Sequence, residues 1–241
     1  MAAPIQKLAL LCKRLFAGQS REKLTSEYLS PLICEVNKIK ATDLRFDVSE
    51  IEEREANLKE YQRAPVTYMP LLDESSHTMS VFILKQGSSL PLHDHPQMYG
   101  MLKVICGKIK VTSYSVIESE PMPENVENIL TYSRSRRTRS NDMVKTVIKN
   151  EDVIVSSEDG CCVLSPSEGN IHEIHPLTNI AAFLDVLAPP YADDDSCHYY
   201  HEVASDKADQ TKRWLVEVAQ PRSYWCDTIR YKGPQIDISQ D

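Results

Sequence analysis

The sequence lacks features that would place it among nucleic-acid-binding, membrane-spanning or secreted proteins. Its 241 residues carry 27 lysines and arginines against 35 aspartates and glutamates, a formal net charge of −8. Binding to nucleic acid requires a basic face that neutralises phosphates, so this balance argues against such a partner. The N-terminal apolar stretch, residues 5–16, is interrupted by Lys7, Lys13 and Arg14, and no small-residue cleavage site follows it. The charges and the shortness of the stretch argue against a transmembrane helix and a secretory signal.

Paired cysteine motifs are also missing. The chain has seven cysteines, an odd number, and no two of them are spaced as CxxC. A disulfide framework is therefore not expected, and a reducing compartment fits better. Hydrophobic residues make up 41% of the chain and charged residues 26%, which is ordinary for a globular protein with a buried core. We expect a monomer in the cytoplasm, with the nucleus as the alternative, that binds neither nucleic acid nor membrane.

Two regions with different patterns divide the chain. In residues 1–64, apolar residues recur at helical spacing, first in residues 8–16 and again in residues 28–39. Pro31 falls inside the second pattern, which predicts that the second helix starts there. Residues 65–241 instead contain many short β-rich runs bounded by Gly, Ser, Asn or Asp. We therefore expect an N-terminal helical extension packed on the outside of a sandwich or closed β-barrel.

Two segments between the expected strands have distinctive compositions. Cys106-Gly107-Lys108 predicts a hairpin turn between two alternating strands. Residues 118–141 lack apolar periodicity, which predicts an insertion loop, and within it residues 134–140 form a basic run. The simpler interpretation of this run is a solvated loop, and the alternative is a patch that binds acidic protein segments.

His93 and His95 indicate a metal site. They follow an expected strand and lie two residues apart, so on an extended chain both side chains project from one face while Asp94 points away. Two imidazoles on one face form half of a transition-metal site. An HxH pair alone is weak support, so the surrounding residues decide how it is interpreted.

The surrounding residues resemble the two motifs of the cupins. Residues 87–107 match G-x5-H-x-H-x4-E-x6-G, except that Gly100 stands in place of the glutamate. Residues 160–172 match G-x5-P-x-G-x2-H with one additional residue between the proline and the glycine. This match makes His172 the expected third ligand, since His175 lies outside the motif and would face the other side of an extended strand. We therefore expect a mainly β cupin barrel (a jelly roll) whose three histidines leave about half of an octahedral metal shell open.

Longer stretches resemble one family within the cupins. Pro91–Pro96, Gly169–His172, Ala181–Tyr191 and Cys197–Tyr200 are similar to the cysteamine (2-aminoethanethiol) dioxygenases and the related plant cysteine oxidases. The resemblance extends from residue 65 to residue 200. It implies non-haem Fe(II), no organic cofactor, and addition of both atoms of O2 to a thiol. The implied substrates are cysteamine, giving hypotaurine, and the N-terminal cysteine of proteins, giving a sulfinic acid that acts as an oxygen-sensing degradation signal in the response to hypoxia.

Four further residues are candidates for the site. Asp185 interrupts the apolar run 181–187, and because an unpaired buried carboxylate is costly, we expect it to bond a ligand histidine, a water, the substrate amine or the backbone. The family resemblance favours the active site. Tyr191 follows two prolines and either reaches the pocket with its hydroxyl or packs beside them. Cys197 and Tyr199 would stand side by side on a strand, and the resemblance implies a possible covalent link. The simpler interpretation of Cys197 is a small buried hydrophobe.

Two other functions stay open at this point. One is a three-histidine cupin dioxygenase that acts on a non-thiol substrate such as a diketone or an aromatic ring. A roomy apolar pocket, in place of a carboxylate near the metal, would favour it. The other is a non-catalytic cupin that binds a metal, which intact ligands without O2 uptake on any aminothiol would support. The sequence also leaves open whether cysteamine or a protein N-terminal cysteine is the main substrate.

Overall fold

The computed structural model describes residues 3–17, 24–117, 144–191, 197–205, 209 and 211–239. The expected insertion loop, residues 118–141, and its basic run, residues 134–140, therefore lie outside the described residues. Helices and short 3-10 turns come first: α1 (Pro4–Phe16), α2 (Ser26–Lys38), η1 (Ala41–Leu44), α3 (Val48–Asn57) and η2 (Glu60–Gln62). The strands are β1 (Val66–Asp73), β2 (Thr78–Lys85), β3 (Leu90–His93), β4 (Tyr99–Cys106), β5 (Lys108–Val116), β6 (Val144–Lys149), β7 (Val153–Ser156), β8 (Cys162–Leu164), β9 (Ile171–Pro176), β10 (Ile180–Ala188), β11 (Tyr199–Ser205), β12 (Lys212–Val218) and β13 (Cys226–Thr228). No helix in these ranges is long and apolar enough to cross a membrane.

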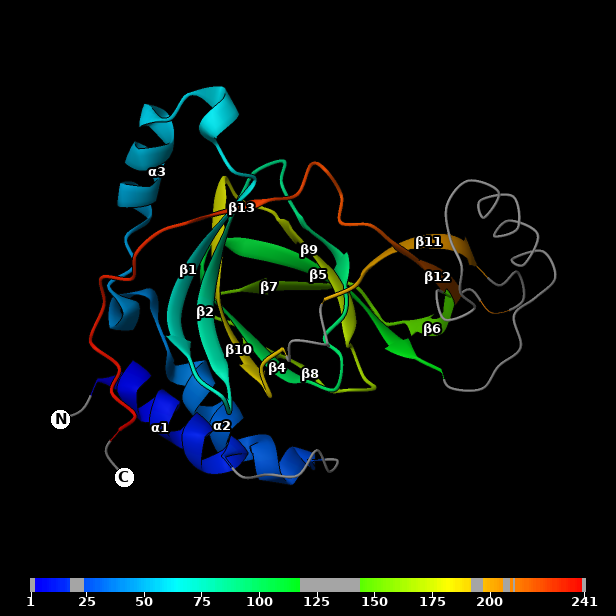
Figure 1. Cartoon of the computed structure of the whole chain (residues 1–241), viewed down its shortest axis with the longest axis horizontal. Coiled ribbons are helices and arrows are strands. Elements are labelled where there is room, and N and C mark those ends of the chain that lie inside the picture. The colour runs from blue at the N-terminus through cyan, green and yellow to red at the C-terminus, as the bar shows by residue number, and fades with distance from the viewer. Residues whose placement is uncertain are drawn as a thin grey trace.

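Two sheets face each other and form the barrel (Figure 1). The strand order is β13-β1-β2-β10-β4-β8 in one sheet and β6-β12-β11-β3-β9-β5-β7 in the other. Neighbouring strands pair antiparallel except β1 and β13, which are parallel. One apolar cluster joins the inner faces, with Leu84 and Phe183 from the first sheet and Ile109 and Ile174 from the second. The prediction of a mainly β cupin barrel is confirmed.

The N-terminal helices cover the outer face of the six-stranded sheet (Figure 1). Successive residues of β10 alternate between two clusters: Phe183 faces the barrel interior, and Leu184 packs with residues of α1 and α2. Because both faces of β10 are covered, nearly all of its positions are apolar. The same alternation turns Asp185 toward the interior. The prediction that the helices pack outside the barrel is confirmed.

The predicted start of the second helix at Pro31 is wrong. Helix α2 begins at Ser26, where the Thr25 side chain caps it by accepting a hydrogen bond from the Tyr28 N–H at 3.2 Å. An interior proline costs about 3 kcal/mol in an isolated helix. Burial of Leu29 and Leu32 against the rest of the outer cluster offsets this cost.

Gly107 turns the chain between β4 and β5, but these strands belong to different sheets, so the predicted hairpin is wrong. The φ angle of Gly107 is +71°, and a Cβ there would lie 2.3 Å from Thr178 Oγ1 and 2.4 Å from the Ile180 carbonyl oxygen. Only glycine allows this close approach of two backbones. The turn therefore forms a corner at which the chain crosses between the two sheets.

Candidate metal centre

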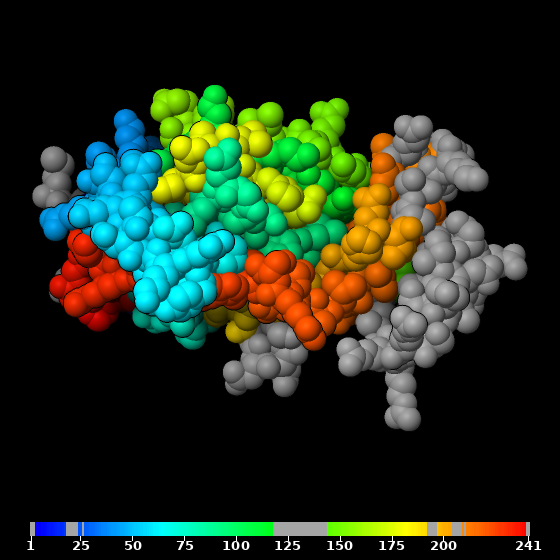
Figure 2. Space-filling model, turned by 90° about the horizontal axis from the view of Figure 1, so that it is seen from above, coloured from blue at the N-terminus to red at the C-terminus, as the bar shows by residue number. Residues whose placement is uncertain are grey.

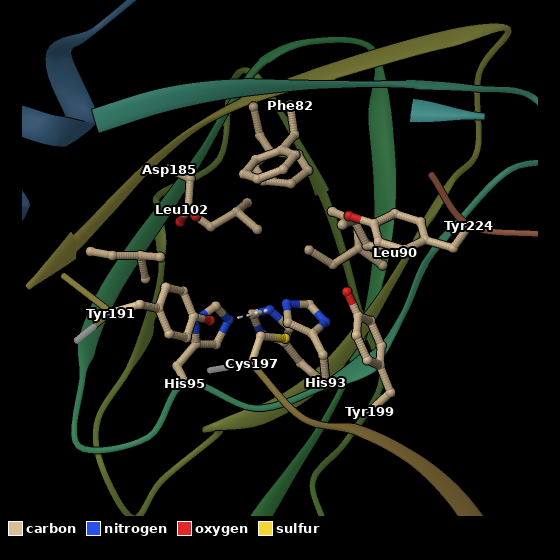
Figure 3. Close-up of a pocket in the computed structure, with 14 residues that line it drawn as sticks. Phe82, Leu90, His93, His95, Leu102, Asp185, Tyr191, Cys197, Tyr199 and Tyr224 are labelled. Atoms are coloured by element: carbon tan, nitrogen blue, oxygen red, sulfur yellow. Dashed lines mark hydrogen bonds between the residues drawn. The ribbon is translucent and has the colours of Figure 1, made fainter. Parts of the chain in front are cut away.

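Three histidines from neighbouring strands meet inside the barrel (Figure 3). Strand β3 pairs antiparallel with β9 so that His93 stands opposite His172, and His95 lies two residues beyond the end of β3. All three side chains are buried, and one potential ligand nitrogen from each lies within 4.8 Å of the others. The arrangement could hold a metal ion.

Hydrogen bonds behind two of the rings determine which nitrogen faces the centre. His93 Nδ1 donates to the Pro91 carbonyl oxygen at 2.7 Å. The Tyr191 hydroxyl donates its proton to the Asp94 carbonyl oxygen at 3.1 Å. The same hydroxyl lies 2.9 Å from His95 Nδ1, and because its proton is already used, its oxygen accepts the hydrogen bond from His95 Nδ1–H. Because Nδ1 carries the proton in both rings, Nε2 is left with its lone pair directed at the centre.

The remaining geometry also suits a cation. His95 Nε2 lies 3.2 Å from His172 Nε2. Burial, followed by the nearby imidazoles, holds the pKa of both rings well below the ordinary value, so both are neutral. Three neutral imidazole nitrogens that converge on one point form a donor set suited to a transition-metal ion.

Asp94 lies between His93 and His95, points out of the site, and is only 1% exposed. Its carboxylate accepts hydrogen bonds from the Tyr200 hydroxyl at 2.8 Å, from the His198 N–H at 2.9 Å and from Lys145 Nζ at 3.0 Å. Burial alone would raise the pKa of Asp94, but the His198 N–H and the Lys145 ammonium lower it below its ordinary value. The ionised carboxylate therefore ties the HxH segment to β11 and β6.

Asn170 fixes the backbone of His95. Its side-chain oxygen accepts from the His95 N–H at 3.1 Å, and its amide group donates to the carbonyl oxygens of His95 at 2.8 Å and Ser165 at 2.9 Å. Asn170 is 4% exposed, so these bonds replace water. We did not predict a role for Asn170 or a bonding network for Asp94, although each stands beside an expected ligand.

A cavity of ≈ 170 Å³ lies beside the three histidines and brings the other four candidate residues together (Figure 3). Asp185, Tyr191, Cys197 and Tyr199 all line it. Burial raises the pKa of Asp185 to about 7. No residue that the structure describes makes a hydrogen bond or ion pair with the Asp185 carboxyl. Of the expected partners, water and the substrate amine are those that could reach it from the cavity.

Cys197 and Tyr199 stand at the side of the cavity where β11 meets β3. Tyr199 is paired with His93 across the two strands, and the centres of their rings are 6.5 Å apart. Burial raises the pKa of the Cys197 thiol to about 11, so the thiol is protonated. The structure thus places this pair next to the histidines.

The motif glutamate has no equivalent in the structure. A Cβ at Gly100 would lie 2.8 Å from Leu164 Cγ and 2.9 Å from Leu187 Cδ2, so apolar side chains close that position. His175 is directed elsewhere, because its Nε2 lies 3.4 Å from a carboxylate oxygen of Glu173 and its side chain is 42% exposed. Among the described residues, the group of potential ligands at this site is therefore the three histidines alone.

Tyr224 also lines the cavity, and we did not predict it (Figure 3). Its ring centre lies 6.0 Å from that of Tyr199. The segment that carries it is brought there because β13 pairs parallel with β1. The remaining lining side chains are apolar: Phe82, Leu90, Leu102, Ile174, Phe183 and Leu187.

Comparison with known proteins places these features in a family. The family model PCO_ADO matches residues 36–236. The 2-aminoethanethiol dioxygenase of Homo sapiens is 33% identical over 83% of this chain and 81% of its own length. The 2-aminoethanethiol dioxygenase of Mus musculus is 32% identical over 98% of this chain and 97% of its own length. Plant cysteine oxidase 2 of Arabidopsis thaliana is 25% identical over 98% of this chain and 84% of its own length. The three-histidine site fits a non-haem iron thiol dioxygenase. The chain belongs to the PCO_ADO family.

Proposed function

We propose that the chain is an Fe(II) thiol dioxygenase that adds both atoms of O2 to the thiol of an aminothiol to give a sulfinic acid. The observation that carries this proposal is the convergence of His93, His95 and His172 beside a small cavity in which Asp185 is the one carboxyl group among the described lining residues. The three imidazoles would hold the iron. When bound, the iron lowers the pKa of the thiol and allows it to react with O2. The reaction is balanced, because RSH and O2 together give RSO2H.

The size of the cavity favours a small substrate. Its volume of ≈ 170 Å³ is below the roughly 300–1,000 Å³ of pockets that hold drug-sized ligands. Cysteamine has four non-hydrogen atoms and fits in this space together with O2. A roomy apolar pocket would support a diketone or aromatic substrate. The small cavity with Asp185 in its wall supports an aminothiol instead.

The charge of the cavity selects among aminothiols. Asp185 faces it, and no lysine or arginine is among its described lining residues. The ammonium group of an aminothiol can therefore pair with Asp185, whereas the α-carboxylate of free cysteine would be buried without a cation among the described lining residues to pair with it. In cysteamine this carboxylate is absent, and in a protein with N-terminal cysteine it is part of a neutral amide. We propose that both of these are substrates and that free cysteine is a poor one.

The other candidate residues have supporting roles in this proposal. Tyr191 orients His95 by accepting its Nδ1–H, and it closes one side of the cavity. Asp185 binds the substrate ammonium. Cys197 and Tyr199 form the proposed Cys-Tyr pair, and mass spectrometry of the purified chain would reveal a link as the loss of two hydrogen atoms.

We further propose a cytoplasmic monomer, with the nucleus as a second location, whose partners are aminothiols, O2 and proteins with N-terminal cysteine. The net charge of −8 supports the absence of nucleic-acid and membrane partners. The free cysteines support a reducing compartment. If N-terminal cysteines are oxidised in cells, the sulfinic product would link the stability of those proteins to the supply of O2.

The test is to load the protein with Fe(II) without oxygen and then to follow O2 uptake and product mass. The substrates are cysteamine, L-cysteine and a peptide that begins with cysteine. We expect a gain of two oxygen atoms on cysteamine or on the peptide, and loss of both uptake and bound iron in the variant His172→Ala. Bound iron with no O2 uptake on any of these thiols would support the non-catalytic alternative and overturn the proposal.

A further inference from the structure

Tyr224 directs a hydroxyl group into the cavity from the side across from Asp185 (Figure 3). Its hydroxyl oxygen accepts a hydrogen bond from the Cys226 thiol at 3.4 Å. With the thiol donating, the proton of the Tyr224 hydroxyl is available to a ligand, and the one acceptor that the described residues place beside it is the Cys226 sulfur, a weak acceptor. Burial raises the pKa of Tyr224 above its ordinary value, so the group keeps this proton. Tyr224 thus offers the cavity a hydrogen-bond donor without a strong acceptor.

The segment that carries Tyr224 is held in place on both sides. The Tyr224 N–H donates to the Pro221 carbonyl oxygen at 3.0 Å, and Gln220 Nε2 donates to the Tyr224 carbonyl oxygen at 3.0 Å. Strand β13 follows and pairs with β1, and its Asp227 accepts a hydrogen bond from the Arg54 guanidinium of α3. The C-terminal segment (orange to red) accordingly lies beside α3 on the surface (Figure 2). Because the segment is held before a ligand enters, little ordering is required for Tyr224 to bind it.

Besides the Tyr191 and Tyr199 hydroxyls and the Cys197 thiol, the cavity walls carry polar groups at three separate places. The histidines are at one, the Asp185 carboxyl is at the second, and the Tyr224 hydroxyl is at the third. The α-carbon of an N-terminal cysteine also carries three groups: the thiol on its methylene, the ammonium and the carbonyl. With the thiol at the histidines and the ammonium at Asp185, the group that still needs a partner is the carbonyl oxygen, and a carbonyl oxygen accepts what Tyr224 donates.

We propose that Tyr224 donates a hydrogen bond to the carbonyl oxygen of the N-terminal cysteine of a peptide substrate. This inference rests on the proposed thiol dioxygenase function. Cysteamine has no carbonyl group, so it uses two of the three contacts, and Tyr224 is a specificity residue for acylated substrates. Contacts to three substituents of one carbon atom also distinguish its two configurations, so L-cysteinyl and D-cysteinyl substrates should react at different rates.

The test compares Tyr224→Phe with the native protein on cysteamine and L-cysteinamide, which differ only by the carboxamide group. We expect kcat/KM for L-cysteinamide to fall about 2- to 12-fold, the effect of one lost neutral hydrogen bond, while the value for cysteamine stays the same. Anaerobic calorimetry should show the same selective loss in the affinity for L-cysteinamide. The ratio of kcat/KM between the favoured and the disfavoured enantiomer of cysteinamide should also become smaller. Tyr231→Phe removes a buried hydroxyl from the same C-terminal segment, at a residue that packs against the outer cluster and does not line the cavity, and it is the matched control, with both substrates unaffected.

Each result supports or overturns the assignment. An equal loss on both substrates would mean that Tyr224 shapes the cavity without recognising the carbonyl, and no loss would mean that it makes no contact; both results overturn the inference. A selective loss in Tyr199→Phe but not in Tyr224→Phe would assign the donor to Tyr199 and also overturn it. If the native protein oxidises cysteamine but not L-cysteinamide, this inference fails and the proposed function stands. If it oxidises neither, nor a peptide that begins with cysteine, the proposed function itself fails.

Discussion

The variant Asp185→Asn measures how much the carboxyl of Asp185 lowers the stability of the folded protein and how much it contributes to the proposed binding of the substrate ammonium. The change keeps the shape of the side chain and removes its charge. In the ligand-free protein, burial raises the pKa of Asp185 from 3.8 to about 7. This difference corresponds to ~4 kcal/mol in favour of the neutral acid. The figure is an upper limit, because the Asp185 side chain is only partly buried and lines the cavity.

The sign of the effect on stability follows from the direction of this pKa change. In the unfolded chain the carboxyl ionises near 3.8, so between about pH 4 and pH 7 the folded state binds the additional proton. Stability of the ligand-free, metal-free protein therefore falls by up to ~4 kcal/mol as the pH rises through this window, and this loss levels off above it. Asp185→Asn lacks this contribution, so the variant should gain stability relative to the native protein as the pH rises.

Urea unfolding of both metal-free proteins at about pH 4.5 and about pH 8 tests this reasoning. Other titrating groups, including the three histidines, are present in both proteins and cancel in the difference. We expect the two proteins to be closer in stability at the lower pH and the variant to be the more stable at the higher one. A difference in stability that does not change with pH would refute the environment assigned to Asp185.

The same variant should lose activity for a specific class of thiol. Removing the carboxylate leaves the substrate ammonium without its charged partner, which we expect to lower kcat/KM for cysteamine by about 10- to 150-fold. For 2-mercaptoethanol, which carries a hydroxyl in place of the ammonium, the loss should be much smaller. Bound iron, measured by elemental analysis, should not change. An equal loss for both thiols, or a loss of iron, would show that Asp185 supports the metal site instead of binding the amine.

Three further predictions concern the neighbours of the histidines and the charge of the cavity. Asp94→Asn weakens the bonds to Lys145 and Tyr200, so competition with a chelator should show metal affinity about 10- to 100-fold lower, with substrate preference unchanged. Tyr191→Phe removes the acceptor for His95 Nδ1–H, and metal affinity in the same assay should fall about 10-fold. With native protein, kcat/KM for free cysteine should be at least about 10-fold below that for L-cysteinamide, because no lysine or arginine among the described lining residues pairs with its carboxylate. Unchanged affinity in either variant, or equal rates on the two substrates, would contradict the corresponding prediction.

Part of this site could be predicted because motif spacing reflects strand register. The two cupin motifs predicted three histidines that the structure brings together, since His93 and His172 stand opposite each other on short paired strands. The apolar run of β10 likewise allowed one polar residue, Asp185, to be singled out before its surroundings were known. In both cases the information is local: a spacing of two, or one charge in an apolar strand.

The features of the site that were not predicted depend on contacts between segments far apart in the chain. Such contacts produce no periodic pattern in the sequence. Asp94 could be predicted to point away from the metal, but not to meet Lys145 and Tyr200, which come from β6 and β11. Tyr224 reaches the cavity through a three-residue strand paired with β1, too short to give an alternating pattern. Pro31 misled the prediction of α2 because packing of the helix against the sheet outweighs the local cost of the proline.

The position of the carboxyl group explains how a cupin without the motif glutamate can select an aminothiol. A glutamate at position 100 would bring a negative charge toward the metal, but there the side chains of Leu164 and Leu187 leave room only for glycine. The carboxyl of this barrel stands instead on β10, in the cavity wall, where no described residue pairs with it. In the proposed function, a metal held by neutral histidines would keep its full charge for an anionic thiolate, while the Asp185 carboxyl would attract the ammonium of the same molecule. Separating the two charges across the cavity would thus match the two ends of an aminothiol, one to the metal and the other to Asp185.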